Sequence, residues 1–149
     1  MSTWLLTWNP SKWKWNDKFD GYEELKSHIR QVGVAYMTWS CGVNKSIKKG
    51  DRLFLIRLSD QHRGIIASGY AASDVIEGPH WDEEKDKAGI KARRVYMEID
   101  RIVDNFDTTP LSMDRLIEIG PGYRWNPQSS GVSIPEEISE QLESIWMTE

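Results

Sequence analysis

The sequence predicts an α+β fold, in which a mixed β-barrel of about five to six strands is flanked by about two or three helices. The order of the predicted elements indicates this fold class: one strand and one helix are followed by four strands, a loop-rich segment and a closing helix. The strands are also short and apolar, and such strands tend to curl into a small barrel. The 149 residues are 39% apolar and contain no linker-like stretch, so we expect a single domain over residues 1–149.

The first third of the chain predicts a strand, a helix and a second strand. Residues 4–7 form a short apolar run that Asn9 and Pro10 end. Apolar residues at spacings of 3, 3, 4 and 3 predict an amphipathic helix over residues 19–32, ended by Gly33. The residues of that apolar face are Phe19, Tyr22, Leu25, Ile29 and Val32. Residues 34–39 are rich in strand formers and predict the second strand.

The middle of the chain predicts a hairpin and a long strand. Residues 48–51 are a turn signal before the apolar run 53–56, and residues 61–64 turn the chain into the run 65–70. Residues 93–103 alternate between apolar and polar side chains, which is typical of a half-buried strand.

Two helices are predicted near the end of the chain. Residues 112–117 fit a short helix. The last helix is predicted to begin with Ser133, because Glu136 follows three residues later in capping-box spacing. Its apolar stripe contains Ile138, Leu142 and Ile145.

The composition argues against several classes of protein. The sequence contains no run of 18 apolar residues, which a membrane-spanning helix would need, and no secretory signal is visible. A single cysteine, Cys41, cannot form an internal disulfide, which suits the reducing cytoplasm where we expect this protein.

The sequence does not favour an enzyme, and we expect no cofactor and no metal. No glycine-rich nucleotide loop is present, and the histidines and the cysteine lack metal-ligand spacing. Cys41 has no histidine near it in sequence to act as a base. The acidic run 82–86 contains Lys85 and is interpreted as a solvated loop.

Charge is divided unevenly along the chain. Residues 1–63 hold 11 Lys/Arg and 6 Asp/Glu, a balance of +5, and residues 64–149 hold 8 and 17, a balance of −9. A net charge of −4 argues against non-specific coating of nucleic acid but allows a basic patch. The residues predicted to hold phosphates are Lys12, Lys14, Lys45, Lys48 and Lys49.

Eight tryptophans are more than a core of this size requires. Trp4 and Trp146 stand in an apolar strand and an apolar helix stripe and are predicted to be core residues. Others stand at predicted strand ends and in loops, which can converge on one mouth of a small barrel. Two indoles about 7 Å apart would sandwich a planar base. Such stacking contributes about 1–3 kcal/mol per base, which can offset the cost of flipping it from a duplex.

Several motifs together resemble the EVE and YTH families of PUA-like domains. They are Met37–Ser40, Lys49–Leu55, Gly64–Gly69, Trp81 and Val95–Met97. The stretch Trp125–Pro135 is similar to the EVE-type module at the N-terminus of modification-dependent restriction endonucleases, where HNH or McrB-type parts are joined to it. Trp8, Trp13 and Trp15 have no clear YTH counterpart and favour the endonuclease type.

The resemblance implies a mixed barrel whose aromatic cage holds one modified base flipped from its strand. YTH members read methylated adenine in RNA, and the endonuclease-linked members read 5-methyl- or 5-hydroxymethylcytosine in DNA. We therefore expect a DNA-binding specificity domain of a modification-dependent restriction system. Any nuclease would lie on a fused or associated HNH or McrB-type part.

Site residues follow position by position from the resemblance and from the predicted strand ends. Trp39 and Trp81 match cage residues, Asn9 matches a residue that bonds the base edge, and the backbone of Ser40 lies beside the base. Trp8 and Trp125 complete the predicted base-binding set. The predicted mouth and edge contacts are Gln128, Ser129, Tyr123, Trp13 and Trp15.

Two other kinds of reader fit the same residues. An RNA-modification reader of YTH type would bind methyladenine with a similar cage. A tryptophan cage also binds quaternary cations such as methylated lysine.

Overall fold

The apolar segments form one sheet of seven strands in the part of the chain that the computed structural model describes, namely residues 2–10, 21–58, 63–80, 82–103 and 109–148. The strands are β1 (Thr3–Trp8), β2 (Ala35–Ser40), β3 (Arg52–Arg57), β4 (Gly64–Ala71), β5 (Ile76–Gly78), β6 (Ala92–Ile102) and β7 (Val132–Ser133). Their order is β2-β6-β4-β3-β1-β7, and β5 pairs with β6. The α+β class is confirmed, with more strands than predicted.

The pairing of the strands is mostly antiparallel. The predicted hairpin is present, since β3 pairs with β4 and its first residue, Arg52, lies opposite Tyr70. The long strand β6 pairs with both β4 and β2. The pair β1 and β3 is parallel, which the sequence patterns did not predict. A parallel pair needs a long crossover, and the segment containing β2 provides it.

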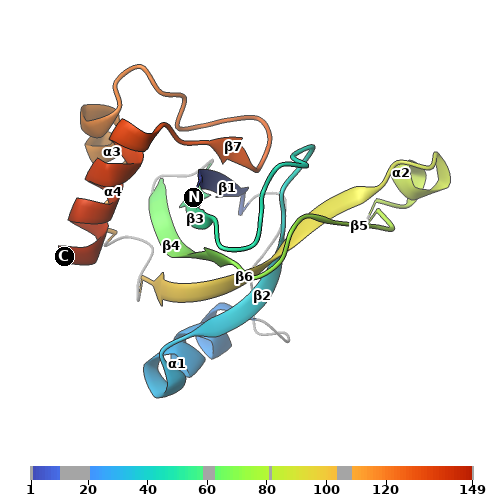
Figure 1. Cartoon of the computed structure of the whole chain (residues 1–149), viewed down its shortest axis with the longest axis horizontal. Helices are drawn as coiled ribbons and strands as arrows, with labels where there is room; N and C mark the ends of the chain where they lie inside the picture. Colours follow the sequence, from blue (N-terminus) through green and yellow to red (C-terminus); the bar gives the residue numbers. More distant parts are fainter. Residues whose placement is uncertain (1, 11–20, 59–62, 81, 104–108, 149) are drawn as a thin grey trace.

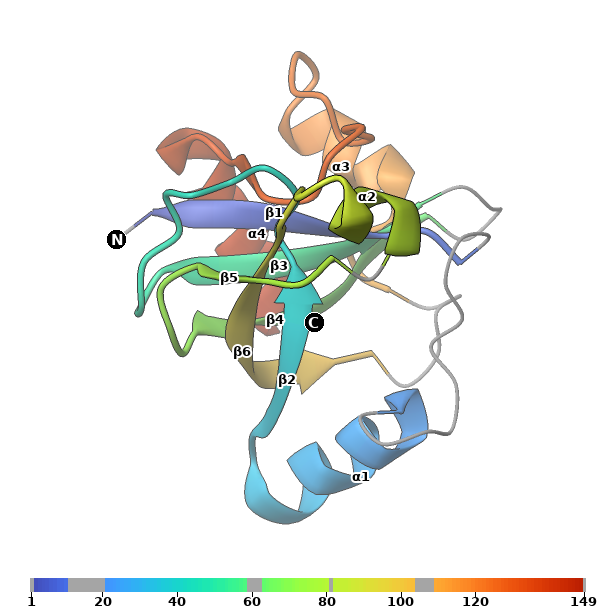
Figure 2. The same cartoon turned by 90° about the vertical axis from the view of Figure 1, so that its right-hand side faces the viewer.

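The predicted mixed barrel is open, because the sheet curls without closing through its backbone. Strand β2 is one edge of the sheet, and β1 with the two-residue strand β7 forms the other. Figures 1 and 2 show the strands wrapping around a common interior. The ends of β1 and β2 nevertheless meet, through the side-chain hydrogen bonds described below.

Four helices lie outside the sheet in the described residues: α1 (Tyr22–Val32), α2 (Glu83–Lys87), α3 (Met113–Ile119) and α4 (Glu136–Thr148). Helix α1 buries Tyr22 and Leu25 and packs on β2 and β6 (Figure 1). Val32, predicted on the same face, is 62% exposed and is the last residue of α1. Within the described residues, no helix has the length and apolar character needed to cross a membrane.

Three elements were missed, and one helix start was misplaced. Helix α2 occupies the predicted acidic loop, with the Asp82 carboxylate accepting from the backbone of Glu84 and Lys85. Strands β5 and β7 have three and two residues, too few to show a periodicity. The last helix begins at Glu136 because Ser133 belongs to β7, where it lies opposite Trp4 of β1.

Helix α4 is fixed to the sheet by a buried polar network. The guanidinium of Arg52 bonds Glu143 of α4, Asp100 at 2.9 Å and the Gly69 carbonyl at 3.1 Å. The indole of Trp146 donates to the Ser68 hydroxyl at 2.7 Å. Trp146 is therefore a core residue, as predicted, and the charge of Arg52 is compensated in the interior.

Asp51 fastens the start of β1 to the turn before β3. Its carboxylate accepts from the Trp4 indole at 2.8 Å and from the backbone N–H groups of Ser2 and Lys48 at 3.2 and 3.0 Å. Trp4 was predicted to be a core residue. In the structure it is half-buried and packs against the core. Burial raises the pKa of Asp51, but the hydrogen bonds from Lys48, Trp4 and Ser2 outweigh it and leave the pKa below its ordinary value.

We predict that Asp51→Ala lowers the free energy of unfolding by about 1–3 kcal/mol at pH 7, because three partly buried donors, on Ser2, Trp4 and Lys48, lose their shared acceptor. A lowered pKa contributes stability above the unfolded value near pH 3.9, and this contribution is lost as pH falls through the folded value. The gap between wild type and variant therefore narrows in acid. Urea unfolding at pH 7 and at pH 3 measures it, with the exposed Glu140→Ala as control. Equal stability of Asp51→Ala and wild type at pH 7 would contradict the anchor.

Candidate functional site

The C-terminal ends of β1 and β2 meet although these strands are not neighbours in the sheet. The Trp39 indole donates from Nε1 to the Thr7 carbonyl at 3.0 Å. The Ser130 hydroxyl accepts from the Thr7 N–H at 3.1 Å and donates to the Ser40 carbonyl at 2.7 Å. We call these four residues, Thr7, Trp39, Ser40 and Ser130, the β1–β2 junction.

The junction satisfies backbone groups that no strand pairs. Strand β7 covers β1 only at Trp4 and Leu5, so the outer edge of β1 at Thr7 lacks a partner strand. Half-buried N–H and C=O groups need hydrogen bonds. The side chains of Trp39 and Ser130 provide both, one to each group of Thr7. The strand alternation of β2 points Trp39 inward, next to Met37 on the same face.

Two glycines allow the loop before β7 to approach the end of β2. Gly42 and Gly131 both have positive φ, of 60° and 87°. A Cβ on Gly42 would collide with the Ser129 hydroxyl, and one on Gly131 would lie 2.7 Å from the Cys41 carbonyl oxygen. The Gly131 N–H also donates to the Leu5 carbonyl at 2.9 Å, and the Gly131 carbonyl accepts from the Asn44 side-chain amide at 2.6 Å. Only glycine permits this contact.

Four predicted base-binding residues lie at the same end of the sheet. Trp8 and Asn9 are at the end of β1, and Trp39 and Ser40 at the end of β2. Trp39 is 8% exposed and Trp8 is 5% exposed, so both indoles pack into the core, whereas Ser40 is exposed. The Arg57 guanidinium lies over the Trp8 ring, 5.5 Å from its centroid. Trp81, Trp13, Trp15, Lys12 and Lys14 lie outside the described residues.

Trp125 supports the loop before β7 instead of facing its mouth. It is 3% exposed, and its Nε1 donates to the Gly120 carbonyl at 3.2 Å. The Tyr123 ring packs edge-on against it at 4.6 Å between centroids. The Trp125 indole is therefore enclosed under the loop, and its contact with a base stays a prediction.

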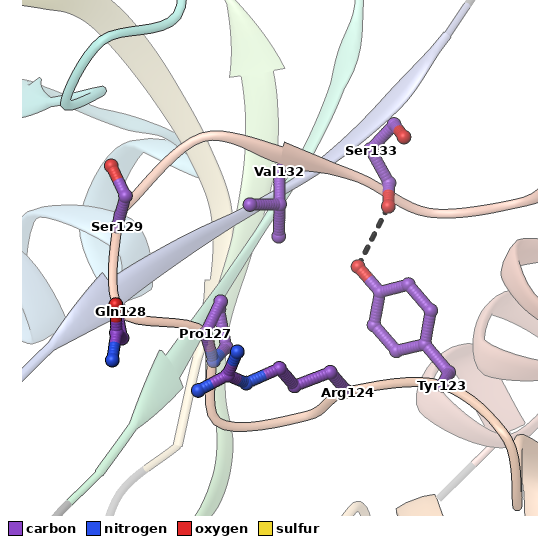
Figure 3. Close-up of a pocket in the computed structure, with 7 residues that line it drawn as sticks. All are labelled: Tyr123, Arg124, Pro127, Gln128, Ser129, Val132 and Ser133. Atoms are coloured by element: carbon purple, nitrogen blue, oxygen red, sulfur yellow. Dashed lines mark hydrogen bonds between the residues drawn. The ribbon is translucent and has the colours of Figure 1, made fainter.

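The same loop forms a surface hollow of about 340 Å³ (Figure 3). It is lined by Tyr123, Arg124, Pro127, Gln128, Ser129, Val132 and Ser133, which include three predicted mouth residues. The Tyr123 hydroxyl donates to the Ser133 carbonyl at 2.7 Å, and burial raises the pKa of Tyr123 to about 12. Tyr123 is therefore a neutral, fixed wall of the hollow near pH 7.

The three predicted phosphate-binding lysines that the structure describes lie in two separate places. Lys45 is exposed beside Asn44, whose amide bonds the loop before β7. Lys48 and Lys49 lie in the turn before β3. Because β1 runs parallel to β3 with Thr3 opposite Arg52, that turn is at the other end of β1, about 15–20 Å from Asn9. Lys48 and Lys49 are therefore not beside the predicted cage residues at the ends of β1 and β2.

Some residues at this end of the molecule were missed by the sequence prediction. Ser130 stands in the stretch Trp125–Pro135 that the sequence analysis singled out. Its hydrogen bonds to β1 and β2 could not be predicted, because those strands are distant from it in sequence. Arg94 is the cross-strand partner of Ser40 and is exposed, which adds a cation near the junction. The nearby Lys91 and Arg93 make a basic cluster with Arg94, which was the available signal in the sequence.

Cys41 follows β2 directly and is fully buried. Burial raises the pKa of its thiol, even though the charge of Arg93 acts in the other direction. A raised pKa disfavours the thiolate form that a nucleophilic cysteine requires.

We predict that Ser130→Ala destabilises the protein by about 1–3 kcal/mol, because Thr7 and Ser40 each lose a hydrogen-bond partner. Urea unfolding measures this, and amide exchange should show faster exchange at Thr7. Ser112→Ala is the matched control, because Ser112 precedes α3 without a side-chain capping bond. Unchanged stability together with unchanged exchange at Thr7 would refute the closure that we assign to Ser130.

Comparisons with known proteins give matches among solved structures, whereas no family model and no curated protein matches. The human THYN1 protein, solved in complex with DNA containing 5-methylcytosine, superposes with a TM-score of 0.65 at 15% identity, over 100% of this chain and 99% of that chain. The DUF55 domain of human thymocyte nuclear protein 1 gives 0.63 at 16% identity, over 99% and 100%. A protein from Pseudomonas syringae gives 0.62 at 16%, over 96% and 98%. The chain therefore has the fold of the human DUF55 domain.

Proposed function

We propose that this protein binds double-stranded DNA and holds a modified cytosine, flipped from its strand, at the β1–β2 junction. The observation that carries the proposal is the meeting of two strand ends that bring Trp39, Ser40 and Asn9 to one place. The fold is shared with the human THYN1 protein, whose structure contains 5-methylcytosine DNA.

The Trp39 indole suits an aromatic wall because it is ordered before any ligand binds. Its N–H is bonded to Thr7 and its ring packs in the core, so little side-chain entropy remains to be lost. Stacking contributes about 1–3 kcal/mol per base, whereas unstacking a base costs a few kcal/mol. A second wall is therefore needed, and we assign it to Trp81, as the resemblance implies.

The polar contacts at the junction would read the edge of the base. The Asn9 amide has both a donor and an acceptor, and the Ser40 backbone lies beside it in this proposal. Burying a methyl group of the modified base adds about 0.8 kcal/mol. This increment favours the modified base over plain cytosine.

The exposed cations would follow the DNA backbone away from the junction. Lys45 and Arg94 are near it, whereas Lys48 and Lys49 lie about 15–20 Å from Asn9. At 3.4 Å of rise per nucleotide, that distance corresponds to about five phosphates of one strand.

The binding function proposed here is that of a specificity module, not of an enzyme. In a modification-dependent restriction system, the cleavage chemistry would be supplied by a nuclease segment or partner of HNH or McrB type. This part of the proposal rests on the resemblance of the stretch Trp125–Pro135.

We predict that Trp39→Ala and Trp81→Ala each abolish the preference for modified over plain duplex and leave weak, salt-sensitive binding. The preference should exceed about tenfold in the wild type, which corresponds to about 1.4 kcal/mol. The measurement is a panel of one duplex with cytosine, 5-methylcytosine, 5-hydroxymethylcytosine or methyladenine, together with matched RNA.

Two further variants keep this test decisive. Trp39→Phe preserves an aromatic ring in the core if Trp39→Ala fails to fold. Tyr36→Ala is the control, because Tyr36 lies in the same strand on the opposite face and is exposed. Full preference in both Trp39→Ala and Trp81→Ala, or in Trp81→Ala where Trp39→Ala does not fold, would show that the cage is assigned wrongly. Tighter binding of modified RNA would replace the DNA reader with an RNA reader.

We also predict that Lys45→Ala, Lys48→Ala and Lys49→Ala weaken modified and plain duplex to the same extent. Each phosphate contact removed should reduce the slope of log K against log salt by about 0.9. Titrations at several salt concentrations measure the slope, with the exposed Lys87→Ala of α2 as control. An unchanged slope in all three variants would exclude these lysines as phosphate contacts.

A further inference from the structure

The surface hollow beside the junction combines an aromatic ring with apolar and polar side chains. Its volume of about 340 Å³ is at the lower end of the range for ligand pockets. Tyr123, Pro127 and Val132 give it apolar walls, and Gln128, Ser129 and Arg124 place polar atoms around them. In Figure 3 the Arg124 side chain extends along the loop toward Pro127.

The aromatic wall of the hollow is held rigidly. The Tyr123 hydroxyl is bonded to the Ser133 carbonyl, and its ring packs edge-on against the enclosed Trp125. A ring fixed at both ends loses little freedom when a ligand stacks on it. The burial of Trp125 thus contributes to a site indirectly, by supporting Tyr123.

Two polar side chains of the hollow are available to a ligand. Arg124 and Gln128 are exposed, and neither takes part in a hydrogen bond or ion pair with any other residue that the structure describes. A guanidinium pairs well with a phosphate, and a glutamine amide offers a donor and an acceptor to a base edge. This combination fits a nucleotide.

The loop that lines the hollow also contacts the β1–β2 junction. Ser129 lines the hollow and lies against Gly42, two residues after Ser40. The next residue, Ser130, bonds both Thr7 and Ser40. A ligand that fills the hollow would therefore lie beside a base held at the junction.

We infer that this hollow holds a second, unmodified base, the immediate neighbour of the flipped base on the same strand. The inference rests on the proposed function. Flipping one base removes a stacking partner from its neighbour. Tyr123 would replace that partner, Gln128 would bond the neighbour's edge, and Arg124 would hold the phosphate between the two nucleotides. The hollow would thereby set the flanking-sequence preference.

The experiment varies the nucleotide on each side of a modified cytosine over the four bases and includes an abasic position on each side. For the wild type, we expect affinity to depend on the base at one side, and the abasic position there to weaken binding about 5- to 100-fold. Gln128→Ala should flatten that base dependence. Arg124→Ala should weaken every modified duplex by a similar factor. Both variants should keep the wild-type ratio of modified to plain cytosine.

Matched controls and the outcomes separate this inference from the proposed function. Gln141→Ala and Arg115→Ala change the same residue types at exposed positions of α4 and α3 and should match the wild type. If flanking bases and abasic positions have no effect, or if Gln128→Ala and Arg124→Ala bind as the wild type does, the inference is overturned while the modified-base preference stands. If the wild type shows no preference for modified cytosine, both proposals fail.

Discussion

The open side of the curled sheet is held by one serine hydroxyl and one indole N–H. Ser130 bonds the backbone of Thr7, 123 residues away in sequence, and that of Ser40, and Trp39 bonds the same residue of β1. Both edges would otherwise present unpaired backbone groups. Because side chains make this closure, the strand ends meet without a continuous ladder, and they bring the candidate base-binding residues to one place.

Buried charge fixes the elements on which that junction depends. Asp51 ties the start of β1 to the turn before β3, and Arg52, the next residue, ties β3 to β6 and α4 through Asp100 and Glu143. Such charges are tolerated in the interior because each is hydrogen-bonded to several partners. Two adjacent residues at the start of β3 thus anchor the first strand and the last helix, and the loop that contains Ser130 runs between α3 and α4.

The tryptophans serve different physical purposes according to what their N–H groups bond. Trp146 and Trp125 are enclosed, with their N–H groups bonded to Ser68 and Gly120, and they support α4 and the loop before β7. Trp39 uses its N–H to bridge two strands at the edge of the core, which makes it both a structural link and the proposed aromatic wall. The same loop contributes Ser130 to the junction and Tyr123 to the hollow, so the two proposed base sites share one support.

Local patterns in the sequence determined the hairpin of β3 and β4, the amphipathic helix α1, the strand β2 with Trp39 near its end, and the core position of Trp146. These features depend on periodicity within a few residues, which the sequence states directly. Tertiary structure alone decided the parallel pairing of β1 with β3, the start of α4, the enclosure of Trp125, the distance of Lys48 and Lys49 from Asn9 and the role of Ser130. Each of these depends on contacts between residues that are distant in sequence, and short-range periodicity contains no information about such contacts.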